Sequence, residues 1–326
     1  MTSVTETARP KPARIKLTPP LIALILAGAL FLVGGLINPD FLNVNQGINI
    51  VRLAAFLGII AAGQTLVIIS GGEGIDLSVG AVVTLGAIVV FRVSDGQNSL
   101  IIVGFAAAMG IGLLIGLLNG IGITWLKIPP LVMTLAVAGV VQGVILIVSQ
   151  GTFEGQAPSM LARFISDPLI GIIPGVLIIW ALVAVIMWLL LERSVYGKQL
   201  FAVGINRETA RLSGVNVPWV LIATYALSGM LAAFGGAILL GFTQTVYFNL
   251  GTPYLFPSIA AVVVGGTLLS GGVGSYWGTM SGALVLTLIS SLLRSLQLPE
   301  AYRLIILGVI LLALISVYGR QRNLRQ

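Results

Sequence analysis

The 326-residue sequence contains neither cysteine nor histidine. Without cysteine the chain has no disulfide bond, no thiolate nucleophile and no cysteine-ligated metal. Without histidine it lacks the commonest general base and the commonest transition-metal ligand. It also lacks the G-x-x-x-x-G-K-[ST] motif that cradles nucleotide phosphates. These absences argue against an enzyme, including one embedded in a membrane, and predict no metal or cofactor.

Charge is scarce as well, at 8% of residues, whereas 57% are hydrophobic and the mean hydropathy is +1.08. Soluble globular domains carry about 25% charged residues. The 41 glycines agree with a membrane protein, because glycine is more frequent in membrane helices than in soluble ones. The composition predicts an all-α polytopic membrane protein of about ten transmembrane helices, some short or broken, with a possible internal repeat.

The spans can be located from their breaks, because each needs roughly 20 apolar residues. Charged residues and Pro/Gly/Asn clusters separate ten candidates. Three of them have only 15 residues, at 77–91, 256–270 and 304–318, and would be tilted, broken or only partly spanning. The other seven are 17–37, 50–70, 100–124, 130–149, 169–191, 217–241 and 276–293.

An even number of spans places both termini on one side of the membrane. With the N-terminus inside, 12 of the 17 Lys and Arg residues lie inside. The positive-inside rule therefore predicts cytoplasmic termini in a bacterial inner membrane. Topology explains the net charge of +7, so no nucleic-acid partner is predicted. Residues 1–16 form a cytoplasmic basic tail, 17–320 a single transmembrane domain and 321–326 a second tail.

One cytoplasmic loop, 192–216, is long and charged. Asn206 is a favourable N-cap and Gly214 a favourable end for a short helix between them. Glu208 and Arg211 are three positions apart, a spacing at which they pair on a helix. Such a helix could dock on a soluble partner or rest on the bilayer. The residues alone favour a mere connector between spans.

The stretch SGGEGIDLSVG at 70–80 predicts a sharp break between two membrane helices. Asp76 can cap the following helix and suits the positive end of its dipole. Irregular backbone at membrane depth needs protein or water around it, so the break should face the bundle interior or the cytoplasmic surface. A similar break, SGGVGS at 270–275, is compatible with internal duplication. The residues assigned to these breaks are Gly72, Gly74, Asp76, Gly80, Gly271 and Gly272.

Each carboxylate of the first break has two interpretations. Asp76 is a cap or a contact to the transported solute, and the cap is favoured because Asp is a leading cap residue. Glu73 is a solvated loop carboxylate, or it contacts an ATPase or a coupling ion. The solvated interpretation is favoured, because a loop at the inner surface keeps the charge hydrated.

Polar residues within spans tend to face the bundle interior. Uncharged amides and hydroxyls suit a neutral, hydroxyl-rich solute such as a sugar. The alternative for each is interhelical hydrogen bonding, which is worth on the order of 1 kcal/mol or less. The candidates are Gln64, Asn119, Thr134, Gln142, Tyr225, Ser228, Thr243, Gln244 and Asn249. For any single residue the hydrogen-bonding interpretation is favoured, and some of Gln64, Asn119, Gln142 and Gln244 are predicted to line a translocation path.

Two glycine series with a spacing of four predict close helix contacts. They lie at positions 112, 116 and 120, and at 274, 278 and 282. They indicate packing and carry no information about the substrate.

Over about residues 53–319 the chain resembles the permease subunits of ribose/monosaccharide-type ABC importers, a binding-protein-dependent transport family, and five segments carry the resemblance in order. They are GIDLSVG at 74–80, NGIGITWLKIPPLVMTLA at 119–136, RETARLSG at 207–214, YALSGMLAAFGG at 225–236 and IAAVVVGGTLLSGGVGSYWGTMSGAL at 259–284. Three features depart from the family pattern and leave the sugar open: the additional Glu73, Gln142 in place of an Arg-Gly pair, and PYLFPS at 253–258.

The resemblance implies that the loop helix docks on a separate ATPase, through Glu208, Ala210, Arg211 and Gly214. Glu208, Ala210 and Gly214 match the family pattern, and Thr209 replaces its first alanine. The implied partners are an ABC ATPase, a periplasmic or extracellular sugar-binding protein, a second permease chain (the same or a sister) and membrane lipid. The chain would be a non-catalytic permease for a sugar or related polyhydroxylated solute. The alternative is an ion-coupled secondary transporter of a small neutral solute.

Overall fold

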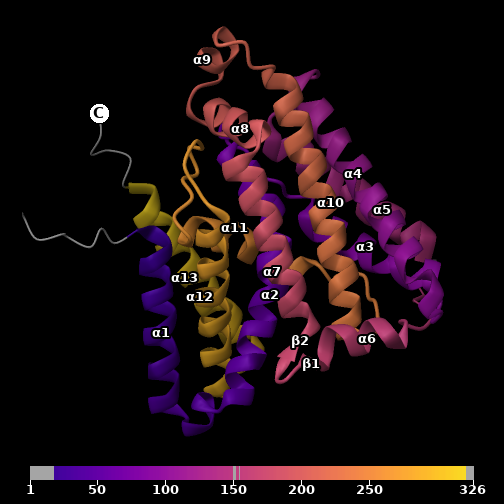
Figure 1. The fold of residues 1–326 in the computed structure, drawn as a ribbon, viewed down its shortest axis with the longest axis vertical. Helices are drawn as coiled ribbons and strands as arrows, with labels where there is room; N and C mark the ends of the chain where they lie inside the picture. The colour runs from indigo at the N-terminus through magenta and orange to yellow at the C-terminus, as the bar shows by residue number, and fades with distance from the viewer. Residues whose placement is uncertain (1–17, 150–151, 154, 321–326) are drawn as a thin grey trace, which may run out of the picture.

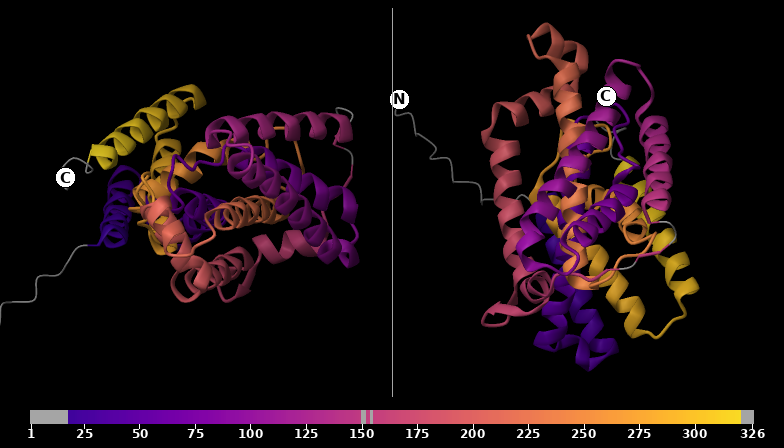
Figure 2. Two further views of the ribbon diagram at one scale, coloured as in Figure 1. Left: turned by 90° about the horizontal axis from the view of Figure 1, so that it is seen from above. Right: turned by 90° about the vertical axis from the view of Figure 1, so that its right-hand side faces the viewer.

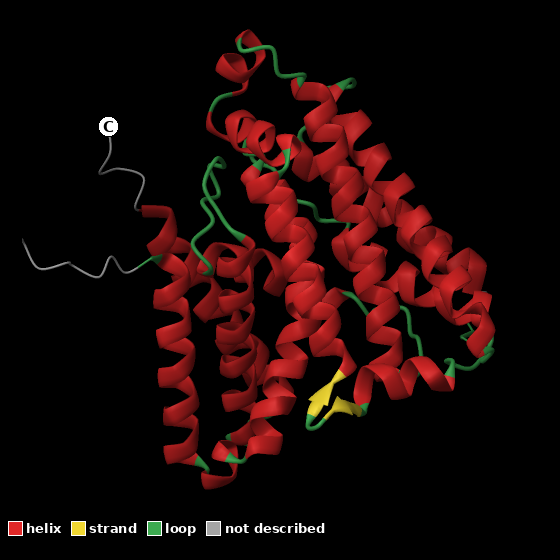
Figure 3. Ribbon diagram, in the orientation of Figure 1, coloured by secondary structure: helices red, strands yellow, loops and turns green. Residues whose placement is uncertain are grey.

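The structure, a computed structural model, describes residues 18–149, 152–153 and 155–320. The two predicted cytoplasmic tails, 1–16 and 321–326, lie outside these ranges. The described residues form thirteen α-helices, several short helical turns and one two-stranded antiparallel ribbon (Figures 1 and 3).

Seven helices of the described chain are long and apolar enough to cross a membrane. They correspond to the seven longer predicted spans. These helices are α1 (Pro19–Ile37), α2 (Val44–Ile69), α4 (Ile101–Thr124), α5 (Pro130–Ser149), α7 (Gly175–Trp188), α10 (Val217–Thr243) and α12 (Tyr276–Ser295). A π-helical turn, η3 (Leu189–Arg193), extends α7.

The three 15-residue segments behave differently from one another. Segment 77–91 becomes α3 (Val79–Ser94), and 304–318 lies within α13 (Glu300–Arg320). Segment 256–270 is not one helix, because α11 (Leu255–Val264) ends before two glycines, the second with φ +92°. This segment is therefore broken, which is one of the predicted alternatives, and the count of about ten crossings is not confirmed as such.

Residues 169–174 also differ from the prediction of a span over 169–191. They belong to the ribbon of β1 (Pro168–Ile170) and β2 (Ile173–Pro174), where prolines and a left-handed Gly171 (φ +58°) exclude a helix. Two helices were not predicted: α6 (Ser159–Ser166) and α8 (Val195–Ile205). The remaining helices and turns are α9 (Arg207–Leu212), η1 (Pro39–Leu42), η2 (Asn98–Leu100) and η4 (Thr252–Tyr254).

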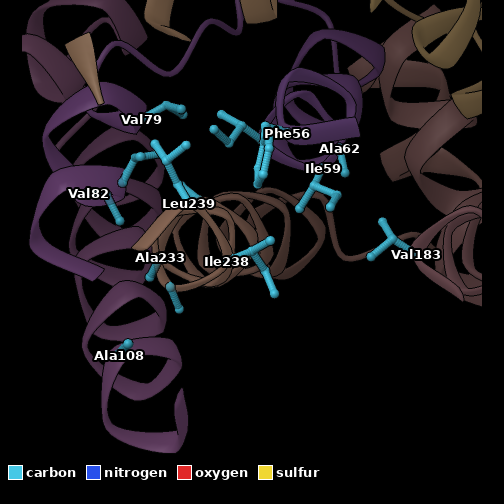
Figure 4. Packing of buried hydrophobic residues seen from close by; sticks show 14 of the residues in the cluster. Phe56, Ile59, Ala62, Val79, Val82, Ala108, Val183, Ala233, Ile238 and Leu239 are labelled. Carbon is cyan, nitrogen blue, oxygen red and sulfur yellow. The ribbon is translucent and has the colours of Figure 1, made fainter. Parts of the chain in front are cut away.

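Helix α10 is the centre of the bundle and contacts α2, α3 and α4. Helix α12 packs against α1, α2 and α11 on one flank, and α4 and α5 lie on the other (Figures 1 and 2). Figure 4 shows Ile238 and Leu239 of α10 among side chains from α2 and α3, with Val183 of α7 on the far side.

Both glycine series make the predicted close contacts. A Cβ on Gly116 of α4 would collide with the Tyr225 carbonyl oxygen of α10, and one on Gly282 of α12 would collide with the Ala261 carbonyl oxygen of α11. Backbone therefore lies against backbone at these crossings, as small residues permit in membrane bundles.

The two ends of the bundle are unlike each other. Helices α8 and α9 project from one end, toward which α1 begins, α2 ends and α13 ends (Figure 1). The opposite end carries η1, α6 and the β-ribbon. We call the first the α9 end and the second the ribbon end.

Candidate functional site

Helix α9 forms as the sequence predicts. The Asn206 side chain accepts the Thr209 backbone N–H at 2.9 Å, and Gly214 adopts φ +84° after the last turn. Glu208 and Arg211 form an ion pair of 2.6 Å, and both side chains are about two-thirds exposed. The helix therefore offers a charged outer face at the tip of the molecule (Figure 1).

The inner faces of α9 and α8 are anchored on the bundle. Ala210 is only 4% exposed, and Leu200 and Val203 of α8 are buried. The Tyr196 hydroxyl lies 2.8 Å from the Thr224 hydroxyl of α10. Burial raises the pKa of Tyr196 to about 12, so the Tyr196 hydroxyl keeps its proton at physiological pH. The α8–α9 unit is thus a fixed part of the bundle.

Helix α8 and the two breaks meet at one glycine junction, formed by Gly71, Gly204, Gly271 and Gly272. The Gly272 N–H donates to the Ile69 carbonyl oxygen at 2.9 Å. A Cβ on Gly204 would collide with the Ile69 carbonyl oxygen and Gly272, and one on Gly271 would collide with the Gly71 backbone. Three separate segments therefore meet with their backbones in close contact.

Arg207 connects α9 directly to the first break. Its guanidinium donates to the Gly71 carbonyl oxygen at 3.1 Å and covers Gly72, where a Cβ would collide with it. Sequence reasoning did not single out this residue. The signal was an arginine at the first position of a helix, where the dipole disfavours a cation and something else must hold it.

Asp76 organises the first break from inside the bundle. Its side chain is fully buried. One carboxylate oxygen accepts the Ser78 backbone N–H at 3.0 Å and the Ser78 hydroxyl at 2.5 Å. The other accepts the Ser228 hydroxyl of α10 at 2.8 Å. The formal N-cap of α3 is Ser78, and Asp76 acts two residues earlier by holding Ser78.

Side chains of three neighbouring helices hold the break. The Gln64 amide of α2 brackets Asp76, donating to its carbonyl oxygen at 2.6 Å and accepting its N–H at 3.3 Å. Asn119 of α4 donates to the Ser78 hydroxyl at 2.9 Å. Thr134 of α5 accepts the Leu77 N–H at 3.0 Å. Gln64 lies five residues before the end of α2, so Asp76 sits about 8 Å inside that end, in the bundle interior.

The other break residues have local roles. A Cβ on Gly74 would lie 2.7 Å from the Val67 carbonyl oxygen, and one on Gly80 would lie 3.3 Å from the Gly251 carbonyl oxygen. The Gly251 N–H donates to the Thr84 hydroxyl at 2.9 Å, which ties α3 to the segment before α11. Glu73 is exposed with φ +60°, as the solvated interpretation expects.

The four predicted path residues do not come together. Gln64 and Asn119 are buried against the break, whereas Gln142 on α5 is exposed. Gln244 is exposed at the ribbon end, where it closes α10 with φ +56°. Their role in translocation stays a prediction.

A cavity of about 1030 Å³ lies at the ribbon end, between α2, α10, α11, α12 and α13. Its wall combines apolar and aromatic side chains with hydroxyl groups and charged residues. The hydroxyl groups belong to Thr243, Tyr247, Thr252, Tyr254, Thr287 and Ser290, and the charges to Arg294, Glu300 and Arg303. Of the polar candidates, Thr243 is the one that contributes to this wall. Within the described ranges no three His, Cys, Asp or Glu side chains gather as a metal site would require.

Comparison with known proteins identifies the family to which the chain belongs. Residues 47–315 match the family described as branched-chain amino acid transport system / permease component. The chain is 34% identical to the ribose import permease of Bacillus subtilis over 87% of both chains. It is 32% identical to the autoinducer 2 import system permease of Escherichia coli, over 94% of this chain and 90% of that one. No solved structure matches the chain. These relatives give no support to an ion-coupled transporter and confirm the predicted resemblance. The chain belongs to this family of permease components and is a non-catalytic membrane subunit of an ABC importer, whose ATP is hydrolysed by a separate ATPase.

Proposed function

We propose that this permease imports a sugar or a related small polyhydroxylated solute. Two of its relatives carry ribose and autoinducer 2 in their names. The cavity at the ribbon end supports the proposal, because hydroxyl and aromatic groups line much of its wall. Neutral donors and acceptors beside aromatic faces suit a hydroxylated solute. Gln244 adjoins this wall through Thr243, while Gln64 and Asn119 lie deeper, beside the first break.

The α9 end is the ATPase-docking end, with Glu208, Arg211 and Gly214 as its docking residues. Ala210, the fourth predicted residue, is buried and contributes only through the inner face that packs α9 on the bundle. The observation that carries this proposal is the direct bond from Arg207 to Gly71, together with the glycine junction beneath it. A displacement of α9 by an ATPase therefore moves the backbone of the first break. Through Gly272 and Ile69 the same displacement reaches the second break.

The orientation follows from this assignment. The α9 end lies in the cytoplasm together with both termini, and the ribbon end faces the solute-binding protein outside. A second permease chain, identical or sister, completes the transporter.

Reconstitution tests the function. We expect the chain, purified with its ATPase and placed in proteoliposomes with a sugar-loaded binding protein, to take up sugar only when ATP is supplied. Uptake under an ion gradient without ATP, and without any associated ATPase, would contradict the assignment as an ATP-driven importer.

The docking residues are tested in the same preparation. Glu208→Lys replaces the ion pair with a like-charge pair on α9, which lowers helix stability by a few tenths of a kcal/mol and reverses the charge of the docking face. We expect co-purification of the ATPase to fall at least several-fold. Asp167→Lys at the ribbon end is the matched charge-reversal control and should not change it. Equal co-purification of both variants would remove Glu208 from the docking site.

A further inference from the structure

A second cavity, of about 370 Å³, lies at the α9 end. Its walls come from the end of α4, the turn into α5, the beginning of α10 and Arg207 of α9. Neither the transport path nor the docking face uses this cavity.

Both charged side chains in its wall are cations, Lys127 and Arg207, and the wall includes no carboxylate. The Nε of Arg207 is buried and makes no hydrogen bond within the described chain, although the guanidinium also serves Gly71. An unused buried donor beside a second cation is a place where an anion replaces the missing hydrogen bond.

The backbone conformation at Lys127 also supports an anion site. It is left-handed, with φ +56°, a conformation that glycine and asparagine adopt far more readily than lysine. The turn itself therefore does not favour a lysine here. Its presence is explained by the charge that it brings to the cavity.

Two tryptophans indicate where the cavity lies relative to the membrane surface. Trp125 at the end of α4 and Trp219 in the first turn of α10 are about 60% exposed, and their rings meet edge to face at 6.4 Å. Tryptophan gathers at the headgroup level of membranes. Exposed apolar side chains continue from there along α5, beginning at Leu131 and Val132. The cavity thus lies where a phospholipid headgroup would sit, with its acyl chains along α5.

We propose that this cavity binds the phosphodiester headgroup of an anionic phospholipid, with Lys127 and Arg207 as its cationic ligands. Basic pockets between membrane helices on the cytoplasmic side are suited to such headgroups. The inference requires only that the α9 end lies at a membrane surface, and it does not depend on the proposed solute. The bound phosphate would contact the same guanidinium that joins α9 to the first break.

Lipid binding to the purified full-length chain, measured by native mass spectrometry, tests the site. The probes are phosphatidylglycerol and phosphatidylcholine with the same acyl chains. We expect one phosphatidylglycerol to bind in preference to phosphatidylcholine. Lys127→Asn suits the left-handed backbone but removes the charge, and should weaken binding about fivefold, the effect of one cation at a membrane surface. Lys127→Arg keeps the charge and should bind as the unmodified chain does.

The matched control is Lys198→Asn, which removes an exposed lysine of α8 outside the cavity and should leave lipid binding unchanged. Equal loss in Lys127→Asn and Lys198→Asn would overturn the site in favour of general surface charge. Equal binding of the two lipids would overturn it as well. Displacement of the lipid by excess inorganic phosphate would show a soluble-anion site instead of a headgroup site.

Discussion

Asp76 is a carboxylate at membrane depth whose three hydrogen-bond donors are a backbone amide and two serine hydroxyls. Burying a charge is expensive unless it is hydrogen-bonded. Hydrogen bonds to a charged group are worth about 1.5–3 kcal/mol each. The three hydrogen bonds offset that cost and hold Asp76 in place. Among the described residues of the break, Asp76 is the one charged side chain that is buried. Asp76 therefore sets where α3 begins and how α10 lies against it.

A substitution pair tests this role. Asp76→Ala leaves the buried hydroxyls of Ser78 and Ser228 without their acceptor, and should lower the free energy of unfolding by about 3 kcal/mol. Glu73→Ala removes the exposed carboxylate three residues earlier, and should change the free energy of unfolding by less than about 0.5 kcal/mol. The measurement is the midpoint of thermal unfolding in detergent, followed by tryptophan fluorescence. Equal shifts in the two variants would show that Asp76 is no more than a loop residue.

At this scale the sequence predicts the character of residues better than their partners. The carboxylate among glycines marked Asp76 as a cap, since that signal is local. Gln64 and Ser228, which are 12 and 152 positions away, could not be assigned to it, because only the folded bundle brings them there. Arg207 was not assigned to the break either, because its bond to the Gly71 carbonyl oxygen also forms only in the folded bundle.

Among the helices, length decides which can cross a membrane alone. Helix α11 has 10 residues and α3 has 16, which rise about 15 and 24 Å against a hydrocarbon core of about 30 Å. Both are short because their glycine-rich breaks use the remaining length. The backbone freed at each break is then satisfied by neighbouring protein.

The glycine series on α4 gives a matched prediction. Gly116→Ala places a methyl group against the Tyr225 carbonyl oxygen and 2.7 Å from the Ala226 Cα. The forced separation of α4 and α10 should cost about 1–3 kcal/mol. Gly110→Ala lies on the same helix with nothing within 4 Å of its Cβ, and should gain up to about 1 kcal/mol from helix propensity. Thermal unfolding should therefore shift in opposite directions. A loss of stability in both variants would mean that the α4–α10 contact is not what distinguishes them.

Helices were predictable where apolar runs are long and uninterrupted, as in α2 and α10. The sequence missed α6 and α8, because they are short segments of mixed composition between spans, and tertiary contacts hold them in place. It also extended the 169–191 span through Pro174, where apolar composition outweighed the turn signals. The helix α9 was predicted correctly because both of its ends, Asn206 and Gly214, carry local signals.

For the molecule as a whole, the α9 end and the ribbon end have different contents. The first gathers α9, both breaks and the basic cavity, and the second holds the large cavity. The separation of the two ends is what an importer needs if ATP acts on one side and solute enters from the other. The sequence predicted the sidedness from charge, but not the junction that joins the breaks to α8.

The absence of cysteine makes the orientation directly testable, since the chain has no thiol of its own. A cysteine is placed directly after α9 as Ser213→Cys or in the turn of the ribbon as Ile172→Cys, both at exposed positions. In intact cells that lack the ATPase, a membrane-impermeant maleimide should label Ile172→Cys at once and Ser213→Cys only after permeabilisation. The reverse pattern would place α9 outside, where no ATPase can reach it, and would overturn the proposed coupling. Labelling of both from the same side would contradict the fold itself, because α7 and its π-helical turn must carry the chain from the ribbon to α8 across the membrane.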